Sequence, residues 1–243
     1  MRSLFALLIA LRPASTYLSF RKHPRKDSRM KFASKLIMAV AMGATALTTL
    51  AGMASAQDAY AVTKYEYTRD EGVDTHGLTF GLSGAYETGF AYDMELMTSD
   101  TDGTGMTGAD VELGYRFSGV AGPVALYEYR KMGGSDADQF LIGVEGGMAF
   151  GDADVFGKLL VDTDDEDVYR ISAGVDYALG NHLSLNGELT HFQNVGSADA
   201  NLLEVGARYH LTGNMHADVG AQYGRADGGA ERTGLHLGLG FDF

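Results

Sequence analysis

The sequence predicts an all-β fold: a transmembrane, antiparallel, up-and-down β-barrel of about twelve strands. Three observations lead to this prediction. From residue 60 onward, apolar side chains recur at every second position rather than at a helical spacing. Glycine is abundant and proline scarce, with 33 Gly against 3 Pro, which disfavours long helices. The alternating runs are each about nine to twelve residues long, the length that a tilted strand needs to cross a bilayer.

Residues 1–56 differ from the rest of the chain and are expected to be a secretory signal peptide. Nine of the 19 Lys and Arg residues lie within residues 1–35, and an uncharged stretch follows at 36–56. The small residues Ala54 and Ala56 suit signal peptidase and place the cut before Gln57. The basic start of such a peptide lies at Met30, so residues 1–29 are a candidate for a mis-called upstream translation start. An uncleaved membrane anchor is the alternative, although the stretch is weakly hydrophobic for one.

Residues 57–243 form the predicted barrel domain and are strongly acidic. They carry 10 Lys and Arg residues against 31 Asp and Glu residues. This excess argues against nucleic acid as a partner, because binding phosphates requires basic side chains. The chain has no Cys, which excludes disulfides, thiol catalysis and thiolate metal sites.

Twelve alternating runs mark the expected strands. The clearest is the last, in which apolar residues from Leu235 to Phe243 alternate with His, Gly and Asp. The runs cover residues 60–69, 76–87, 89–97, 109–118, 123–131, 140–150, 154–162, 168–178, 183–192, 202–211, 215–225 and 234–243. If one hairpin is misread, the strand count becomes ten or fourteen.

The connections predict that the two ends of the barrel differ. Short turns follow the even-numbered runs, whereas longer acidic connections such as 98–108 follow the odd-numbered runs. Short periplasmic turns and longer external loops are typical of transmembrane barrels.

Aromatic residues lie near both ends of the runs and are expected to form two girdles at the lipid–water interfaces. In a soluble barrel, by contrast, aromatic residues would fill the interior. The expected girdle at the short-turn end is Tyr86, Phe117, Phe150, Tyr177, Tyr209 and Phe241, and the other is Tyr67, Tyr129, Phe140, Tyr169, Phe192 and Tyr223.

The polar side of the runs is expected to line the inside of the barrel, because an apolar outside requires a lipid solvent. Acids outnumber Lys and Arg by twelve to six on this side. Buried carboxylates without counter-ions are costly unless water reaches them, so the excess favours a wet lumen. Twelve strands leave a gap of order 10 Å between opposite side chains, which inner glycines would widen. The predicted lining is Lys64, Glu66, Asp93, Glu95, Asp110, Glu112, Arg116, Glu128, Arg130, Glu145, Lys158, Asp162, Arg170, Asp176, Glu188, Glu204, Arg208, His210, His216 and Asp218.

A three-residue hairpin at 212–214 would place Arg208 opposite Asp218 and His210 opposite His216. Two imidazoles without a third ligand make a poor metal site, so we expect neither a metal nor a cofactor. We find no catalytic constellation, and in particular no Ser–His pair on the lipid-facing side. We therefore expect no enzymatic activity.

The last run and its terminal Phe243 resemble the assembly signal of Gram-negative outer-membrane barrel proteins. Together with the signal peptide and the barrel pattern, they make the chain similar to the small, porin-like members of that class, and no narrower family is identified. The resemblance implies a place in the cell outer membrane, among its lipid and lipopolysaccharide. It also implies that the barrel-assembly machinery reads the apolar residues of the last run, which are Leu235, Leu237, Leu239, Phe241 and Phe243.

The function that this resemblance implies is a pore for passive diffusion of small hydrophilic solutes or ions. The excess of inner acids predicts a preference for cations. The alternative is a non-conducting structural or adhesive barrel that acts through its acidic external loops.

Deleting Phe243 is expected to lower the amount of heat-modifiable, membrane-inserted protein and to leave precursor in the periplasm, because the aromatic end of the assembly signal is lost. Gel mobility with and without heating measures this. The variant Glu87→Gln, far from the last run, serves as the control and should assemble normally. Wild-type amounts of folded barrel after the deletion would count against the signal.

Overall fold

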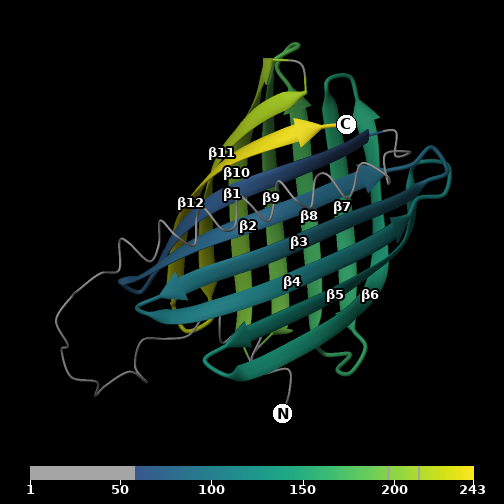
Figure 1. Cartoon of the computed structure of the whole chain (residues 1–243). Coiled ribbons are helices and arrows are strands. Elements are labelled where there is room, and N and C mark those ends of the chain that lie inside the picture. The colour runs from purple at the N-terminus through teal and green to yellow at the C-terminus, as the bar shows by residue number, and fades with distance from the viewer. Residues whose placement is uncertain (1–57, 196–197, 213) are drawn as a thin grey trace, which may run out of the picture.

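Twelve antiparallel strands close into one barrel in the computed structural model, which describes residues 58–195, 198–212 and 214–243 (Figure 1). The predicted signal peptide and its cleavage residues, Ala54, Ala56 and Gln57, lie outside the described residues. Within the described part of the chain, no helix is long and apolar enough to cross a membrane.

Each strand pairs with the next one along the chain, and the last pairs with the first, which confirms the predicted count and topology. The strands are β1 (Asp58–Asp70), β2 (Val73–Ala85), β3 (Phe90–Thr101), β4 (Thr104–Tyr115), β5 (Ala121–Met132), β6 (Ser135–Phe150), β7 (Ala153–Asp162), β8 (Tyr169–Ala178), β9 (Leu183–Val195), β10 (Ala198–Thr212), β11 (Met215–Ala226) and β12 (Glu231–Asp242).

The closing seam joins β1 to β12. The register runs from Tyr60 opposite Asp242 to Asp70 opposite Arg232. Just past β12, the amide of Phe243 donates to the carbonyl of Ala59 at 2.8 Å. We call the end at which β1 starts and β12 finishes the proximal end, and the opposite end the distal end. Closure leaves no strand with a free edge, which is what a bilayer demands.

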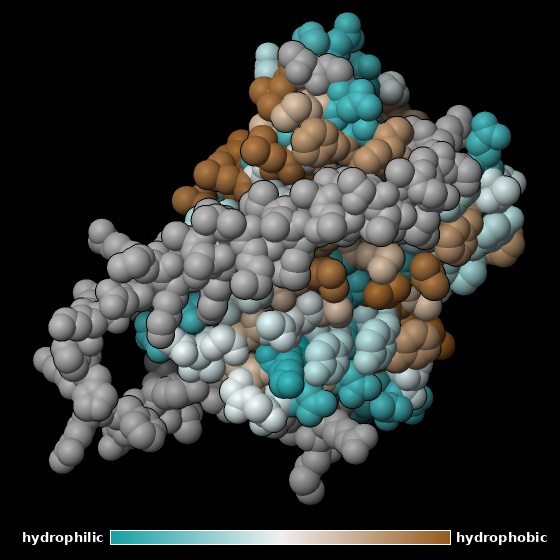
Figure 2. All heavy atoms as spheres, in the orientation of Figure 1, coloured by the Kyte–Doolittle hydropathy of each residue, from teal (hydrophilic) through white to brown (hydrophobic). Residues whose placement is uncertain are grey.

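Alternation along the strands separates an apolar outer surface from a polar inner one. On β12, Leu235 and Leu237 are 60% and 61% exposed, while His236 between them turns inward. Figure 2 shows apolar side chains gathered over the wall near β11 and β12 and hydrophilic ones at the two ends of the barrel. An apolar surface of this extent is unusual for a monomer in water and is normal for one in lipid. The apolar residues of the predicted assembly signal belong to this outer surface.

The predicted difference in loop length between the two ends is wrong. Three of the distal connections are two-residue turns, at residues 71–72, 102–103 and 133–134, because the flanking strands are longer than expected. In all three turns both residues have positive φ, as in a type I′ turn, which fits the right-handed twist of paired strands. The backbone pairing continues through Thr and Asp residues at these strand ends. The side chains of Thr75 and Thr101 also bond to each other there, at 2.7 Å.

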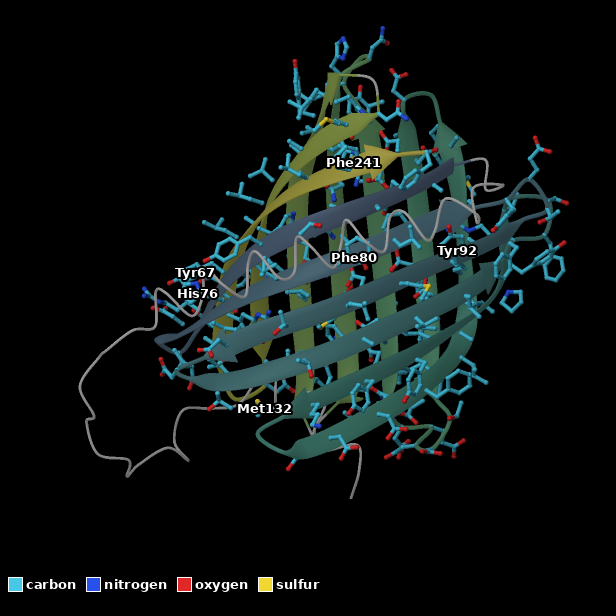
Figure 3. All side chains as sticks on the ribbon, viewed as in Figure 1. Tyr67, His76, Phe80, Tyr92, Met132 and Phe241 are labelled. Atoms are coloured by element: carbon cyan, nitrogen blue, oxygen red, sulfur yellow. The ribbon has the colours of Figure 1, made fainter. Side chains whose placement is uncertain are left out.

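The girdle prediction fails for Phe192, whereas Tyr67 lies on the outer face as predicted. Tyr67 lies on the outer face at the distal end of β1, where its hydroxyl donates to Asp74 at 2.8 Å and its ring contacts His76 (Figure 3). Phe192 instead points inward, because its neighbours in register are Arg170 and Ala200 on the inner face. The alternation of β9 places Phe192 on the same side as Glu188.

A charge on the outer surface should be far more costly than one inside. Leu237→Arg is expected to lower the free energy of unfolding in lipid vesicles by about 2–4 kcal/mol, because Leu237 lies midway along β12. The matched control is His236→Arg, one residue away and facing inward toward Glu66. Urea titration of the refolded variants measures both. Equal costs for the two variants would contradict the assignment of the faces.

Candidate functional site: the barrel interior

All twenty residues predicted to line the interior lie on the inner side of the wall, at positions that alternate with the exposed outer side chains. The clearest evidence is contact between strands that are not neighbours. Lys158 on β7 donates to Glu112 on β4, and Arg170 on β8 donates to Glu128 on β5 at 2.9 Å. Strands three apart in a barrel wall can meet only through the lumen.

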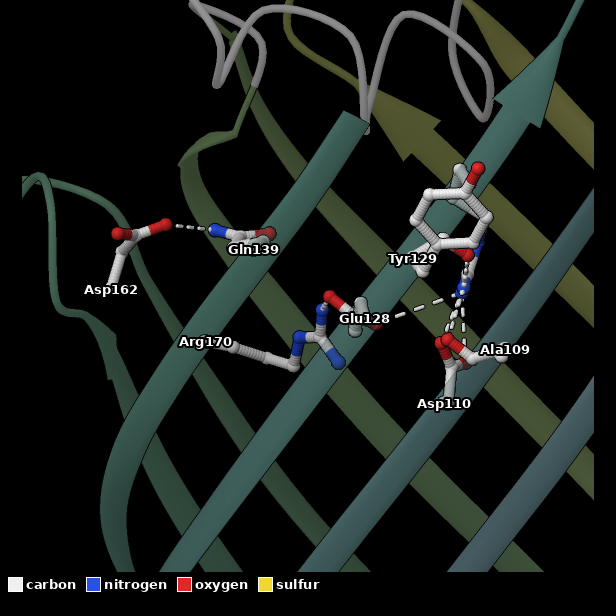
Figure 4. A network of polar contacts seen from close by, with 8 residues as sticks. Ala109, Asp110, Glu128, Tyr129, Gln139, Asp162 and Arg170 are labelled. Atoms are coloured by element: carbon white, nitrogen blue, oxygen red, sulfur yellow. Dashed lines mark hydrogen bonds and ion pairs between the residues drawn. The ribbon is translucent and has the colours of Figure 1, made fainter. Parts of the chain in front are cut away.

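These contacts belong to a larger set of ion pairs over β4 to β8. Arg130 binds Asp110 on the neighbouring strand and lies 3.7 Å from Glu128, which also receives Arg170 (Figure 4). We call the group Asp110, Glu112, Glu128, Arg130, Lys158 and Arg170 the charge lattice. Each carboxylate in the lattice is bonded to at least one cation, so the lattice is locally neutralised.

The inner wall also contains an apolar cluster that the sequence analysis did not predict. Val124 and Leu126 of β5, Leu141 of β6 and Leu160 of β7 pack together and are almost completely buried. Glu112 on β4, the strand next to β5, pairs with Lys158 on β7, the strand that carries Leu160. The signal in the sequence is residues 123–127, where apolar side chains occupy both faces of the run. This part of the lumen is therefore packed like a small protein core.

All six of the inner Lys and Arg residues predicted from the sequence have a carboxylate partner. Besides the lattice, Lys64 lies 3.8 Å from Glu95, Arg116 lies 3.0 Å from Glu145, and Arg208 lies 2.8 Å from Asp218. The register also places Asp70, Asp154 and Arg232 on the inner side. Six of the twelve inner acids predicted from the sequence form no ion pair within the part of the chain that the structure describes. They are Glu66, Asp93, Asp162, Asp176, Glu188 and Glu204.

Three of these six acids are held by neutral donors. Asp93 accepts from Ser83, Asp162 accepts from Gln139, and Glu188 accepts from Thr190 at 3.0 Å. Neutral donors orient a carboxylate without cancelling its charge. The charge of these acids therefore remains available to a mobile cation.

The proximal end carries a second polar group. Arg208 pairs with Asp218 and His210 with His216 in register, as predicted, but the three-residue loop is wrong, because β10 continues to Thr212, which pairs with Met215 after a register shift. His216 is completely buried, with ring nitrogens 3.2 Å from Asp242 and 3.5 Å from Asp218. No group of three or more His, Cys, Asp or Glu side chains that could hold a metal ion occurs among the described residues.

The sequence analysis missed other inner residues that this end brings together. The guanidinium of Arg208 lies 4.8 Å above the ring of Tyr60, a cation–π arrangement. His236 faces inward beside Gly220 on the neighbouring strand. The alternation of β1 and β12 already placed both residues inside, but a count of Asp, Glu, Lys and Arg does not include them.

The inner glycines do not widen the lumen as predicted. A Cβ at Gly220 would lie 2.2 Å from the ring of His236, and one at Gly240 would lie 2.2 Å from the ring of His216. The missing side chains therefore make room for a ring from the neighbouring strand, which occupies the space above the glycine.

A cavity of about 220 Å³ remains midway along the barrel, between the charge lattice and β9 and β10. Its charged lining is the pair of Glu112 and Lys158, Arg170 of β8, and Glu188 and Glu204 of β9 and β10. The last two lie directly opposite each other in register on neighbouring strands.

A twelve-stranded antiparallel barrel with an apolar outside and a charged interior defines the class: a small, porin-like outer-membrane β-barrel. Solved porins share this fold. KdgM porin aligns with a TM-score of 0.54 at 14% identity, over 75% of this chain and 99% of its own. NanC porin aligns with a TM-score of 0.55 at 14% identity, over 74% of this chain and 98% of its own.

A further structure shows KdgM porin in complex with disordered oligogalacturonate, with a TM-score of 0.53 over 75% of this chain. No sequence-family model matches the chain, and none of the curated proteins compared with it matches. The likeness to porins therefore establishes the fold.

The cross-lumen pair of Glu112 and Lys158 is expected to stabilise the barrel. A double-mutant cycle of Glu112→Gln and Lys158→Met should give a coupling free energy of about 2 kcal/mol, the range of charged hydrogen bonds. Urea unfolding in lipid vesicles provides the four free energies. Additive effects of the two substitutions would show that the pair contributes nothing to stability.

Proposed function

We propose that this chain forms a pore in the outer membrane for passive diffusion of small hydrophilic solutes or ions, with a preference for cations. The observation that carries the proposal is the imbalance inside the barrel. The predicted inner Lys and Arg residues are all engaged by carboxylates, while Glu66, Glu188, Glu204 and three further acids form no ion pair among the described residues. Carboxylates left in a low-dielectric wall without counter-ions require water or mobile cations.

The apolar outer surface supports a membrane location. A wall with Leu, Val and Phe exposed along its length is stable only in lipid, which would be the outer membrane with its lipopolysaccharide. In this proposal the chain is exported by its signal peptide, and the barrel-assembly machinery inserts it after reading the last strand. The fold shared with KdgM and NanC porins supports the same location.

The distal rim strengthens the preference for cations. Acids occupy the turns and strand ends there, among them Glu71, Asp102 and the four residues 164–167. An acidic mouth raises the local concentration of cations, and the low-dielectric wall focuses the field into the lumen. Oligogalacturonate, seen with KdgM porin, is a polyanion, so its passage would be opposed here.

The alternative, a non-conducting structural or adhesive barrel, rests on the packed part of the interior. The charge lattice and the apolar cluster fill the lumen beside β4 to β8. An adhesive role is less well supported, because two-residue turns at the distal end offer few side chains to a partner. Neither version assigns a catalytic role to any residue. Single-channel conductance in a planar bilayer separates the pore from the alternative.

The unpaired carboxylates are expected to set selectivity. In a KCl gradient at low salt the reversal potential should indicate K⁺ preference, and Glu66→Gln with Glu204→Gln should lower the K⁺/Cl⁻ permeability ratio by roughly twofold or more. The preference should weaken in concentrated salt, since the screening length falls from about 10 Å at 0.1 M to about 3 Å at 1 M.

Glu231→Gln is the matched control, because Glu231 lies on the outer side and accepts from Tyr223 at 3.2 Å. Because Glu231 begins β12 at the distal rim, this variant should shift the reversal potential much less than the two inner substitutions do. Chloride preference in the wild-type protein at low salt would refute the proposed role of the wall.

A further inference from the structure

We propose that the mid-barrel cavity is a binding subsite for small zwitterions with an apolar body, of which an aliphatic α-amino acid is the simplest. This inference deepens the proposed function by naming a class of solute, and it rests on that function for its physiological meaning. The cavity has about 220 Å³ of space and is lined by charges of both signs, the cations on β7 and β8 and an acidic pair on β9 and β10.

The acidic side of the cavity fits an ammonium group. Glu188 on β9 and Glu204 on β10 are direct neighbours in register, and neither forms an ion pair within the described chain. Like charges directly opposite each other in a sheet are destabilising. An ammonium between them would relieve this repulsion and offer three donors. The hydroxyl of Thr190 already holds Glu188 in place at 3.0 Å.

The basic side fits a carboxylate. Arg170 donates to Glu128 through one terminal nitrogen, and its Nε is buried without a hydrogen-bond partner in the described structure. The guanidinium also lies 5.0 Å above the ring of Phe192, which fixes its plane. The buried Nε is out of reach of a solute, so the terminal nitrogen that does not bind Glu128 is the donor that Arg170 can offer to a ligand in the cavity. A guanidinium matches carboxylate geometry well.

The remaining lining is apolar where the body of the solute would lie. Leu160, Phe192 and Leu202 also line the cavity, and Leu160 and Phe192 lie directly opposite Arg170 in register on its two neighbouring strands. The space is well above what a single water needs and admits one small organic solute. A free metal cation would leave Arg170 and the apolar side chains unused, and a simple anion would meet Glu188 and Glu204.

The test is binding of L-leucine to the refolded barrel in detergent, measured by titration calorimetry, with two analogues that each lack one charge. Leucine methyl ester has no carboxylate, and N-acetyl-leucine has no ammonium. We expect saturable binding of leucine and affinities for both analogues that are lower by about tenfold or more. These comparisons use the wild-type protein and do not depend on whether a variant folds.

Two variants then assign the groups. Glu204→Gln should weaken leucine binding by about tenfold and affect the methyl ester similarly, because both ligands present an ammonium. Glu231→Gln, on the outer side, should leave binding unchanged. Heat modifiability of each variant verifies the fold.

The outcomes separate the subsite from the pore. Equal binding of leucine and its methyl ester would mean that the cavity binds cations only. Tighter binding of N-acetyl-leucine than of leucine would mean that it binds anions. Either result, or the absence of leucine binding, overturns the proposal. A barrel that conducts ions without binding leucine refutes only the subsite. A barrel that binds leucine without conducting refutes only the pore.

Discussion

In a bilayer the peptide groups of a strand have no water to bond, so each must find its partner within the wall itself. Closure of β1 onto β12 meets that requirement, and the rest of the structure depends on it. Once the sheet is closed, each strand has one side toward lipid and one toward the lumen. A period of two in side-chain polarity then separates a solvent-like interior from an apolar exterior. The charged residues lie inside because the apolar side of each strand faces lipid.

The sequence was sufficient for features that depend on neighbours along the chain. Alternation identified the twelve strands and their inner faces, and one hairpin was enough to pair Arg208 with Asp218. The two-residue distal turns were also readable, because Asp102 and Gly103 form the dipeptide that favours a type I′ turn. The loop prediction failed because polar residues were interpreted as the ends of strands. In the structure these residues belong to the strands.

Contacts across the lumen could not be predicted in this way. The pairing of Glu112 with Lys158 depends on the curvature and stagger of the closed wall, which no local pattern records. The packing of Leu126, Leu141 and Leu160 could not be predicted either. Each is an apolar residue on an inner face, and only the closed barrel brings them into contact with one another. As a result, the sequence identified which charges lie inside but not which of them neutralise one another. In the structure one side of the interior is packed, and a cavity remains on the other side, around Glu188 and Glu204.

The seam has one further consequence. Residues 59 and 243 are joined by a backbone hydrogen bond, and β1 and β12 pair as regularly as any two strands that share a hairpin. A short linker could therefore join the two ends, and the chain could be reopened at the turn of residues 102–103 with every ladder retained. In such a circular permutant β12 would keep its place in the wall while losing its place at the end of the chain. The geometry of the barrel thus makes structural closure by this strand physically separable from the proposed assembly signal.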